Sequence, residues 1–387
     1  MSEIDLDSGR VRFDESTDWT VGIEEEFAIL DPETLDLTPG FERLRDGAAH
    51  DPLLSAAIAG ELISSEIEIR SGRGADLAAA IEAQRERRRR LFALAAAQGV
   101  RLAATATHPW ADYRSQRIID TEHYHRVHDG LRYVARRNNT FSVHVHVGVR
   151  GADRSVAVCD RLRHVLPELL AISANSPFLE GADSGLHSVR SQIFTKSFPR
   201  CGIPDPFGDW RGFQRYIEFL IETRSIVEYT QVWWSVRPHL TFGTVEVRIC
   251  DVQGTAAESE ALTGLIVACV AQAAREVDEG RTPPELPARL LEENMWRAIR
   301  YGLDGELIDL HRGETYPAAA AAERLLAWTE EVRAELGIEP QLPARNGAQR
   351  QRALLEQGMT LAEAYAATVE LAEETYADGS KTRVEVR

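Results

Sequence analysis

Lysine is almost missing from this 387-residue chain, which contains only Lys196 and Lys381. Nearly all of its 44 basic residues are therefore arginines, and 61 Asp and Glu residues give a formal net charge of −17. Nucleic acids and anionic membranes attract basic surfaces, so this balance argues against either of them as a partner. Because lysine is so scarce, we consider Lys196 as a candidate functional residue below.

Cysteine is also scarce, with four residues that form no C-x-x-C pair: Cys159, Cys201, Cys250 and Cys269. Nothing in their spacing suggests a disulfide framework, so we expect buried free thiols, as in a reducing cytoplasm. The first residues, "MSEIDLDSGRVRFDES", contain no apolar segment of the kind that a signal peptide needs. No run approaches the roughly 18 apolar residues of a membrane-spanning helix. These absences together predict a cytoplasmic protein.

The rest of the sequence is organised as a short polar segment followed by one interleaved unit. We expect residues 1–17 to be a flexible tail and residues 18–387 to form a single domain. The segment 177–210 is rich in Gly, Pro, Ser and Phe and is long for a passive connection, which favours a functional loop. Helical patterns are predicted at 75–100, 258–279, 285–303, 317–336 and 349–376. In the first of these helices, the arginine run 87–90 is expected on a solvated face.

Four segments that are far apart in the chain alternate apolar with charged residues, as half-buried strands do. They are "VGIEEEFA", "SEIEIR", "SVHVHV" and "TVEVRI". Successive side chains of a strand point to opposite faces, so one face of each strand is apolar. The other faces carry Glu24 and Glu26; Glu66, Glu68 and Arg70; Ser142, His144 and His146; and Thr244, Glu246 and Arg248. This pattern predicts an α+β fold with a mostly antiparallel sheet, helices on its apolar face and a helical C-terminal part.

The concentration of carboxylates on one face needs a physical explanation. A plain solvated face is common in antiparallel sheets, but neighbouring carboxylates repel one another unless a cation lies between them. Oxygen-rich groups with one imidazole suit Mg²⁺, with Mn²⁺ as an alternative. The two histidines of "HVHVG" could instead chelate zinc, although the cysteines lack ligand spacing. Glu25 lies on the apolar face, where we expect a structural partner such as a helix arginine.

Five ordered blocks then carry a resemblance: "TVGIEEEF", "FSVHVHVGV", "VWWSVRPHLTFGTVEVRICD", "EENMWRAIRYGLDGELID" and "RNGAQRQR". Together they resemble the bacterial carboxylate–amine ligases related to glutamate–cysteine ligase, the type 2 group, over residues 18–377. The resemblance implies a glutamine synthetase-like fold that carries metals and ATP on a curved sheet. It also implies that the γ-carboxylate of L-glutamate is joined to the amine of L-cysteine through an acyl phosphate, with release of ADP and phosphate. A homodimer is expected by the same resemblance.

Residue roles follow from the resemblance, position by position. The metal ligands that it implies are Glu24, Glu26, Glu61, Glu68, His144 and Glu246. Glu66 points to the same face and is left open between direct and indirect contact. The nucleotide ligands that it implies are His146, Arg248, Arg190 and Lys196, and the substrate ligands are Arg237, Tyr124 and Arg190. Among these, Arg248 and Arg237 are the expected catalytic residues, since guanidinium groups neutralise transferring phosphate.

Several alternatives stay open at this point. Arg237 could form a structural ion pair, Lys196 could be solvent-exposed, and Ser235 stands where the family usually has an acidic residue. The same ligase chemistry could serve a different amine or carboxylate substrate. Two alternatives belong to other functional classes. One is a nucleotide-binding regulatory protein with little catalysis, and the other is a zinc hydrolase.

Overall fold

A curved sheet of seven strands forms the centre of the protein, in a computed structural model that describes residues 4–378. The strand order is β10-β11-β5-β1-β3-β2, with β4 paired to β1, and every pairing within it is antiparallel. The strands are β1 Val21–Leu30, β2 Ile58–Ala59, β3 Glu66–Arg70, β4 Arg101–Ala103, β5 Val143–Gly148, β10 Val236–His239 and β11 Thr244–Val247. The four predicted alternating segments are the strands β1, β3, β5 and β11, which confirms the α+β class.

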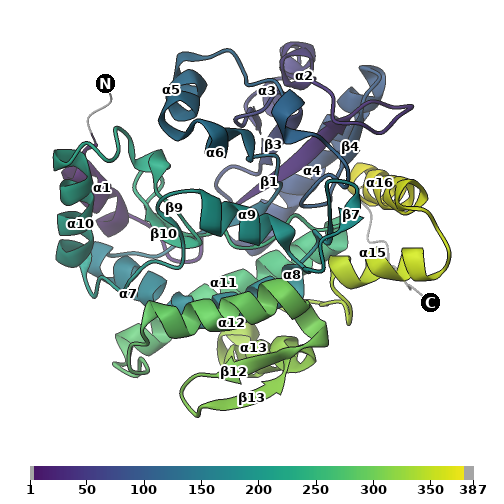
Figure 1. The fold of residues 1–387 in the computed structure, drawn as a ribbon. Coiled ribbons are helices and arrows are strands. Elements are labelled where there is room, and N and C mark those ends of the chain that lie inside the picture. Colours follow the sequence, from purple (N-terminus) through teal and green to yellow (C-terminus); the bar gives the residue numbers. More distant parts are fainter. Residues whose placement is uncertain (1–3, 379–387) are drawn as a thin grey trace.

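Helices cover the apolar face of the sheet, and the core lies between them. The valines of β5 pack against α7 (Ala152–Leu162), α8 (Leu166–Ser173) and α11 (Ala256–Asp278). Phe27 and Ile67 pack against α4 (Leu77–Ala97) and α16 (Leu361–Asp378). Each fully buried side chain of this size contributes roughly 1.5–3 kcal/mol. In Figure 1 the sheet crosses the molecule between α5 and α6 at the top and α11 and α12 at the bottom.

The predicted flexible tail over residues 1–17 needs a correction, because helix α1 (Leu6–Asp14) forms there. Asp5 caps this helix by accepting a hydrogen bond from the backbone N–H of Ser8 at 2.9 Å. Phe13 is fully buried and its ring lies 5.6 Å from that of Trp210. The polar composition of the segment concealed these few apolar anchors. Residues 1–3 lie outside the described part of the chain.

The long helices predicted after residue 258 are broken into more pieces than expected. The observed elements are α11, α12 (Ala288–Tyr301), α13 (Ala321–Trp328), α14 (Glu330–Leu336), α15 (Gly347–Glu356) and α16. A hairpin of β12 (Glu306–Asp309) and β13 (Glu314–Pro317) was missed. Gly302 and Gly337 adopt positive φ values of 50° and 66°, which end α12 and α14.

Shorter elements complete the fold. They are α2 (Phe41–Ala48), α3 (Pro52–Ser55), α5 (Glu122–Leu131), α6 (Tyr133–Arg136), α9 (Val189–Ser197), α10 (Trp210–Glu222), β6 (Phe178–Leu179), β7 (Ala182–Asp183), β8 (Cys201–Gly202) and β9 (Trp233–Trp234). The predicted functional loop 177–210 thus contains a helix, α9, and three short strands. All four cysteines are free thiols, and three of them are buried as predicted, whereas Cys201 is only partly buried.

Glu25 is paired on the apolar side of the sheet, as the sequence suggested. Arg88 of α4 donates to its two carboxylate oxygens at 2.5 and 2.6 Å, and Gln84 donates at 2.8 Å. Ser259 of α11 donates a further hydrogen bond. Arg88 is only 1% exposed, so the prediction that the whole arginine run 87–90 is solvated was wrong at this residue. The run covers more than one face of the helix, and one arginine points inward.

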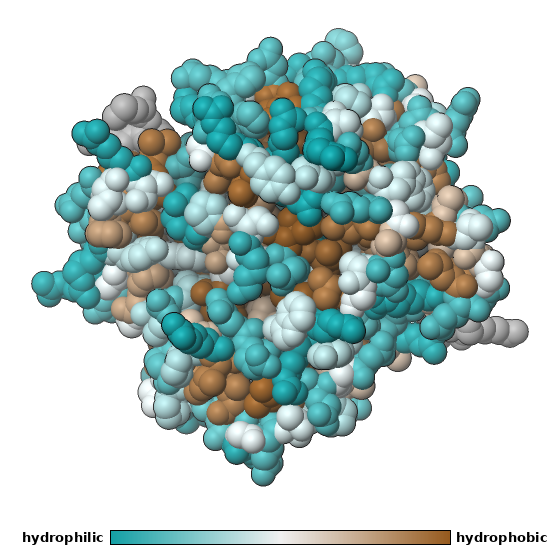
Figure 2. Space-filling view, in the orientation of Figure 1, coloured by the Kyte–Doolittle hydropathy of each residue, from teal (hydrophilic) through white to brown (hydrophobic). Residues whose placement is uncertain are grey.

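Most of the surface in Figure 2 is hydrophilic, with apolar residues gathered near the centre of that face. Within residues 4–378, no helix combines the length and the apolar character that crossing a membrane requires.

Candidate active site

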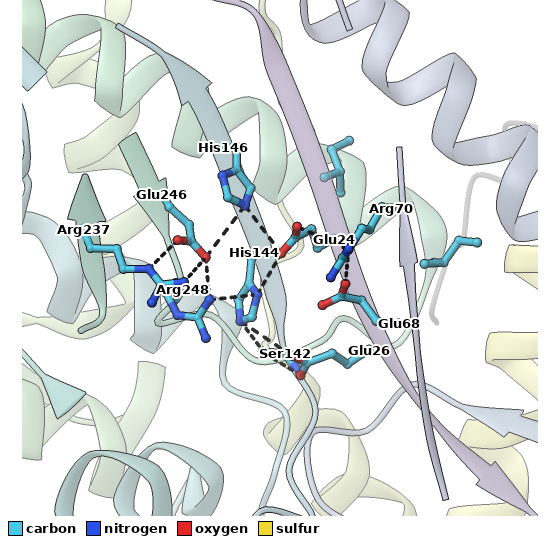
Figure 3. A network of polar contacts seen from close by, with 12 residues as sticks. Glu24, Glu26, Glu68, Arg70, Ser142, His144, His146, Arg237, Glu246 and Arg248 are labelled. Carbon is cyan, nitrogen blue, oxygen red and sulfur yellow. Dashed lines mark hydrogen bonds and ion pairs between the residues drawn. The ribbon is translucent and has the colours of Figure 1, made fainter. Parts of the chain in front are cut away.

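The antiparallel pairing brings the charged faces of the strands together. Glu24 of β1 lies opposite His144 of β5, and Glu26 lies opposite Glu68 of β3. Glu246 of β11 lies opposite His146. Figure 3 shows these side chains converging from neighbouring strands on one side of the sheet. Residues that are more than 200 positions apart in the sequence are thus brought to one site by strand register alone.

Two arginines hold Glu246 at one end of this site. Arg237 donates to its carboxylate at 2.6 Å and Arg248 at 2.5 Å. Burial alone would raise the pKa of Glu246, but these two guanidinium groups outweigh it and keep the pKa well below its usual value. Both predicted catalytic arginines are therefore in the site, and Arg237 also makes the structural ion pair that was weighed against a binding role.

The two histidines occupy the middle of the site. The Nδ1 atom of His144 lies 3.4 Å from a carboxylate oxygen of Glu24, and the Nε2 atom of His146 lies 3.5 Å from the same oxygen. Burial and the neighbouring Arg248 lower the pKa of His144. Burial also works against protonation of His146, but Glu24 and Glu246 outweigh it and raise its pKa. Both imidazoles are within reach of the same carboxylate, so the geometry leaves the predicted division between a metal ligand and a phosphate ligand open.

Carboxylates crowd the other end of the site with little compensation. Burial and the charge of Glu26 raise the pKa of Glu61 to about 7. Burial and neighbouring carboxylates also raise the pKa values of Glu66 and Glu68 well above normal. One oxygen of Glu66 is buried with no hydrogen-bond partner among the described residues. Glu26 is held differently, because it accepts hydrogen bonds from the backbone N–H and hydroxyl of Ser142 at 2.5 and 2.6 Å.

These groups fit divalent cations. Three sets of residues each place one ligand atom per residue within 4.8 Å of one another, and they are Glu26, Glu61 and Glu68; Glu24, His146 and Glu246; and Glu24, Glu68 and His144. Each set has at most one imidazole and no cysteine, which suits Mg²⁺ or Mn²⁺ better than zinc. A cation would also relieve the repulsion that raises the carboxyl pKa values. Glu61 lies in the loop between β2 and β3, whereas the other residues of these three sets lie on strands.

Two cavities open beside this cluster and share Glu24, Arg70, Thr241 and Phe242. The first, of about 370 Å³, is lined by six glutamates and by His144, Arg237 and Arg248. Tyr124 of α5 also lines it and donates its hydroxyl to the carbonyl oxygen of Gly60. The second cavity, of about 420 Å³, contains His146.

Two predicted anion ligands are placed differently. Lys196 of α9 is exposed, lies 3.5 Å from Glu292, and does not line either of these cavities. Arg190 does line the first cavity, but its guanidinium donates to the carbonyl oxygens of Ile249 and Arg248 at 3.0 and 3.2 Å. It therefore holds the chain after β11 in place. The sequence could not distinguish an anion ligand from a surface or structural residue here, because a basic residue in a long loop can serve in either way.

Sequence reasoning also missed several lining residues. Arg70 was placed on the charged face but given no role, although it pairs with Glu68 and lies 3.6 Å from Glu24. His123 was assigned nothing, and its Nδ1 atom lies 3.1 Å from Glu228 at the first cavity. The alternation of β3 indicated Arg70, whereas nothing in the local sequence around His123 pointed to Glu228.

Comparison with known proteins identifies the family. The model of glutamate–cysteine ligase family 2 matches residues 20–377. The chain belongs to this family. A protein of Sorangium cellulosum, provisionally named glutamate–cysteine ligase 2, is 39% identical over 340 residues, which cover 88% of this chain and 89% of the relative. One of Rubrobacter xylanophilus, with a similar provisional name, is 40% identical over 354 residues, covering 89% and 94%.

Solved structures show the same fold at low sequence identity. The glutamate–cysteine ligase of Francisella tularensis, solved in complex with AMP, has a TM-score of 0.63 at 12% identity, with 95% of this chain and 91% of that chain covered. A bifunctional glutathione synthetase of Pasteurella multocida has a TM-score of 0.65 at 12% identity, covering 96% of this chain and 54% of that one. The predicted fold is thereby confirmed as that of the glutamate–cysteine ligases.

Proposed function

We propose that this member of glutamate–cysteine ligase family 2 is an ATP- and Mg²⁺-dependent ligase that joins the γ-carboxylate of L-glutamate to the amine of L-cysteine. The observation that carries the proposal is the single sheet face on which carboxylates, two imidazoles and two guanidinium groups converge between two cavities. Family membership supports the reaction class, and the provisional names of the relatives support the substrates.

In the proposed reaction, a γ-carboxylate oxygen of glutamate attacks the γ-phosphorus of ATP, and ADP leaves. The amine nitrogen then attacks the acyl carbon, the C–O bond to phosphate breaks, and the nitrogen loses a proton. Arg248 is suited to neutralise charge on the transferring phosphoryl group, because its guanidinium lies at the cluster and is oriented by Glu246. Arg237 is held by the same carboxylate and can orient an anionic substrate group.

The residues that would hold divalent cations are the acidic and imidazole groups described above, with His146 added to the predicted ligand set. Bound there, Mg²⁺ would supply charge neutralisation and alignment for the phosphate oxygens. The chain itself contributes the fixed positions, since Ser142 anchors Glu26 and two arginines anchor Glu246. A homodimer and a cytoplasmic location remain predictions.

The test is ADP release with ATP, Mg²⁺ and L-glutamate across a panel of amines led by L-cysteine, with the product mass recorded. A cysteine-dependent rise in ADP together with a γ-glutamylcysteine mass is the expected result. ADP release with another amine would keep the ligase reaction and change the substrate. Absence of ATP use with L-glutamate and every amine tested would overturn the proposal.

A further inference from the structure

Helix α5 lines the first cavity without being packed into the core. None of its ten residues is buried, whereas α4 and α11 bury many of theirs. Figure 1 shows α5 on the other side of the sheet from α11 and α12. It nevertheless supplies His123, Tyr124 and Val127 to the lining of the cavity. A helix with so little buried surface is held by a small number of side chains and opens at low cost in free energy.

Two contacts join α5 to different walls of this cavity. On one side, the hydroxyl of Tyr124 donates to the carbonyl oxygen of Gly60. On the other side, the Nδ1 atom of His123 lies 3.1 Å from the Oε1 atom of Glu228. Glu228 precedes the one-turn helix Tyr229–Gln231, and two residues of that turn line the same cavity. The contact between His123 and Glu228 therefore bridges two parts of the lining that are far apart in the chain.

This contact does not have the alignment of a hydrogen bond. The Oε1 atom of Glu228 is buried and has no hydrogen-bond partner among the described residues, although the ring nitrogen of His123 is 3.1 Å away. A buried acceptor without a partner costs free energy. A small rotation of α5 would align an N–H with it, since the charged imidazole and one neutral tautomer both carry a proton on Nδ1.

The C-terminal end of α5 has the backbone strain that is typical of moving segments. Arg132 follows the helix with a φ of 54° and a ψ of −120°, a conformation that residues with a side chain rarely adopt. Strained residues of this kind cluster at ligand clamps and switch regions. The helix is thus a short rigid element beside a strained residue, with one of its two contacts to the cavity walls incomplete.

The proposed reaction has an intermediate that water can destroy. Water that attacks the acyl carbon breaks the C–O bond to phosphate and returns glutamate, so that ATP is used and no amide is formed. Closing segments of enzymes exclude water from such intermediates.

We propose that His123 and Glu228 are positioning residues that close α5 over the first cavity and keep water away from the acyl phosphate until the amine attacks. This inference rests on the proposed function, since the acyl phosphate is the intermediate of that reaction. Neither side chain is assigned a contact with the reacting atoms. Their loss should therefore lower the yield of amide per ATP more than it lowers the affinity for ATP.

The first experiment measures ADP release with L-glutamate alone, and then the ratio of ADP to amide when L-cysteine is added. His123→Ala and Glu228→Ala should each raise the ADP released without amide roughly two- to fivefold, the range that a partly exposed ion pair contributes to an equilibrium. His125→Ala is the matched control and should resemble the parent protein. His125 lies on the same helix, 2.8 Å from Asp120, and does not line the cavity. Circular dichroism and Tm show that each variant is folded.

An exchanged pair separates the contact from the individual side chains. His123→Glu alone places two carboxylates together, so it should release more ADP without amide than His123→Ala does. Adding Glu228→His restores a contact between an imidazole and a carboxylate and should recover most of the amide yield. A double variant with no better yield than His123→Glu alone would overturn the closing role of the contact.

Hydrogen exchange of the full chain tests closure without the reaction. The amides of residues 122–131 should exchange faster in His123→Ala than in the parent protein, and at the parental rate in His125→Ala. Equal exchange in His123→Ala and the parent would overturn the contact, and faster exchange with an unchanged amide yield would overturn the exclusion of water. Parent protein that uses no ATP would overturn the proposed function and, with it, the exclusion of water, whereas the exchange rates would still decide the closing contact.

Discussion

Glu24 and Glu25 are neighbours in β1, yet their side chains point to opposite faces of the sheet and have different partners. Glu25 receives hydrogen bonds from Arg88, Gln84 and Ser259, all within the core. Glu24 lies near two imidazoles and Arg70 at 3.4–3.6 Å, distances at which hydrogen bonds are weak. The apolar face therefore compensates its one charge within the fold, whereas the polar face keeps carboxylate oxygens free for ligands.

The same contrast extends to the whole polar face. The chain relieves the repulsion among Glu61, Glu66 and Glu68 only in part, through arginines such as Arg70, and their pKa values stay raised. Strain of this kind persists at functional sites because a ligand relieves it. We therefore expect substitutions on the polar face to reduce activity and substitutions on the apolar face to reduce stability.

The largest expected effect is on activity. Glu24→Ala or Glu246→Ala should reduce turnover by at least roughly 10²–10³-fold, because each removes a group that orients charge at the phosphoryl transfer site. The protein should stay folded in both cases, as judged by circular dichroism, although Glu246→Ala leaves the buried Arg237 and the partly buried Arg248 without their partner. Near-parental kcat in either variant would refute the metal-ligand assignment.

The opposite face should respond in stability. Glu25→Ala leaves Arg88 buried with only Glu260 at 3.2 Å as a counter-ion, and breaking a buried pair of this kind costs about 3–5 kcal/mol. Urea denaturation should therefore show a lower midpoint at an unchanged m-value. The double variant Glu25→Ala, Arg88→Met should recover part of the loss. An equal loss in the double variant would mean that packing, and not the unpaired charge, is responsible.

Mg²⁺ should stabilise the protein more at pH 8 than at pH 5.5. Because the pKa of Glu61 is raised to about 7, its contribution to stability without metal is complete below the unfolded value near 4.5 and is lost as pH rises through 7. A cation binds the deprotonated form and restores that loss. The difference in Tm between protein with Mg²⁺ and protein with EDTA should thus be a few °C larger at pH 8 than at pH 5.5.

Histidines outside the three cation sets titrate equally in both arms of that comparison, so they cancel in the difference, whereas His144 and His146 belong to those sets and add a pH dependence of their own. Glu61→Gln is the matched variant, and it should bind Mg²⁺ more weakly and lose the part of the pH dependence that Glu61 contributes. A Mg²⁺ effect that is independent of pH in the parent protein would contradict the raised pKa of the carboxyl group.

Strand alternation explains why so much of the site could be predicted from sequence. The period of two assigned Glu24, Glu26, His144 and Glu246 to one face without any knowledge of the fold, and antiparallel register then had to bring them together. The partner of Glu25 was predictable in kind, since a buried charge needs a counter-charge, but its identity as Arg88 depended on helix packing across the sheet. The same limit applies to α1, because its few apolar residues are buried by contacts with distant elements such as α10, which the local sequence does not show.

The smallest expected effect concerns Lys196, which lies in α9 and on neither face of the sheet. Its side chain is 52% exposed and its ammonium group pairs with Glu292 at 3.5 Å, and such surface pairs contribute about 0–1 kcal/mol. Lys196→Ala should therefore leave the KM for ATP within about twofold of the parent value and the urea midpoint almost unchanged. A large rise in the ATP KM would mean that α9 moves over the nucleotide during the reaction. The basic side chains that bind phosphate would then include Lys196, on a mobile helix, as well as the arginines of the sheet.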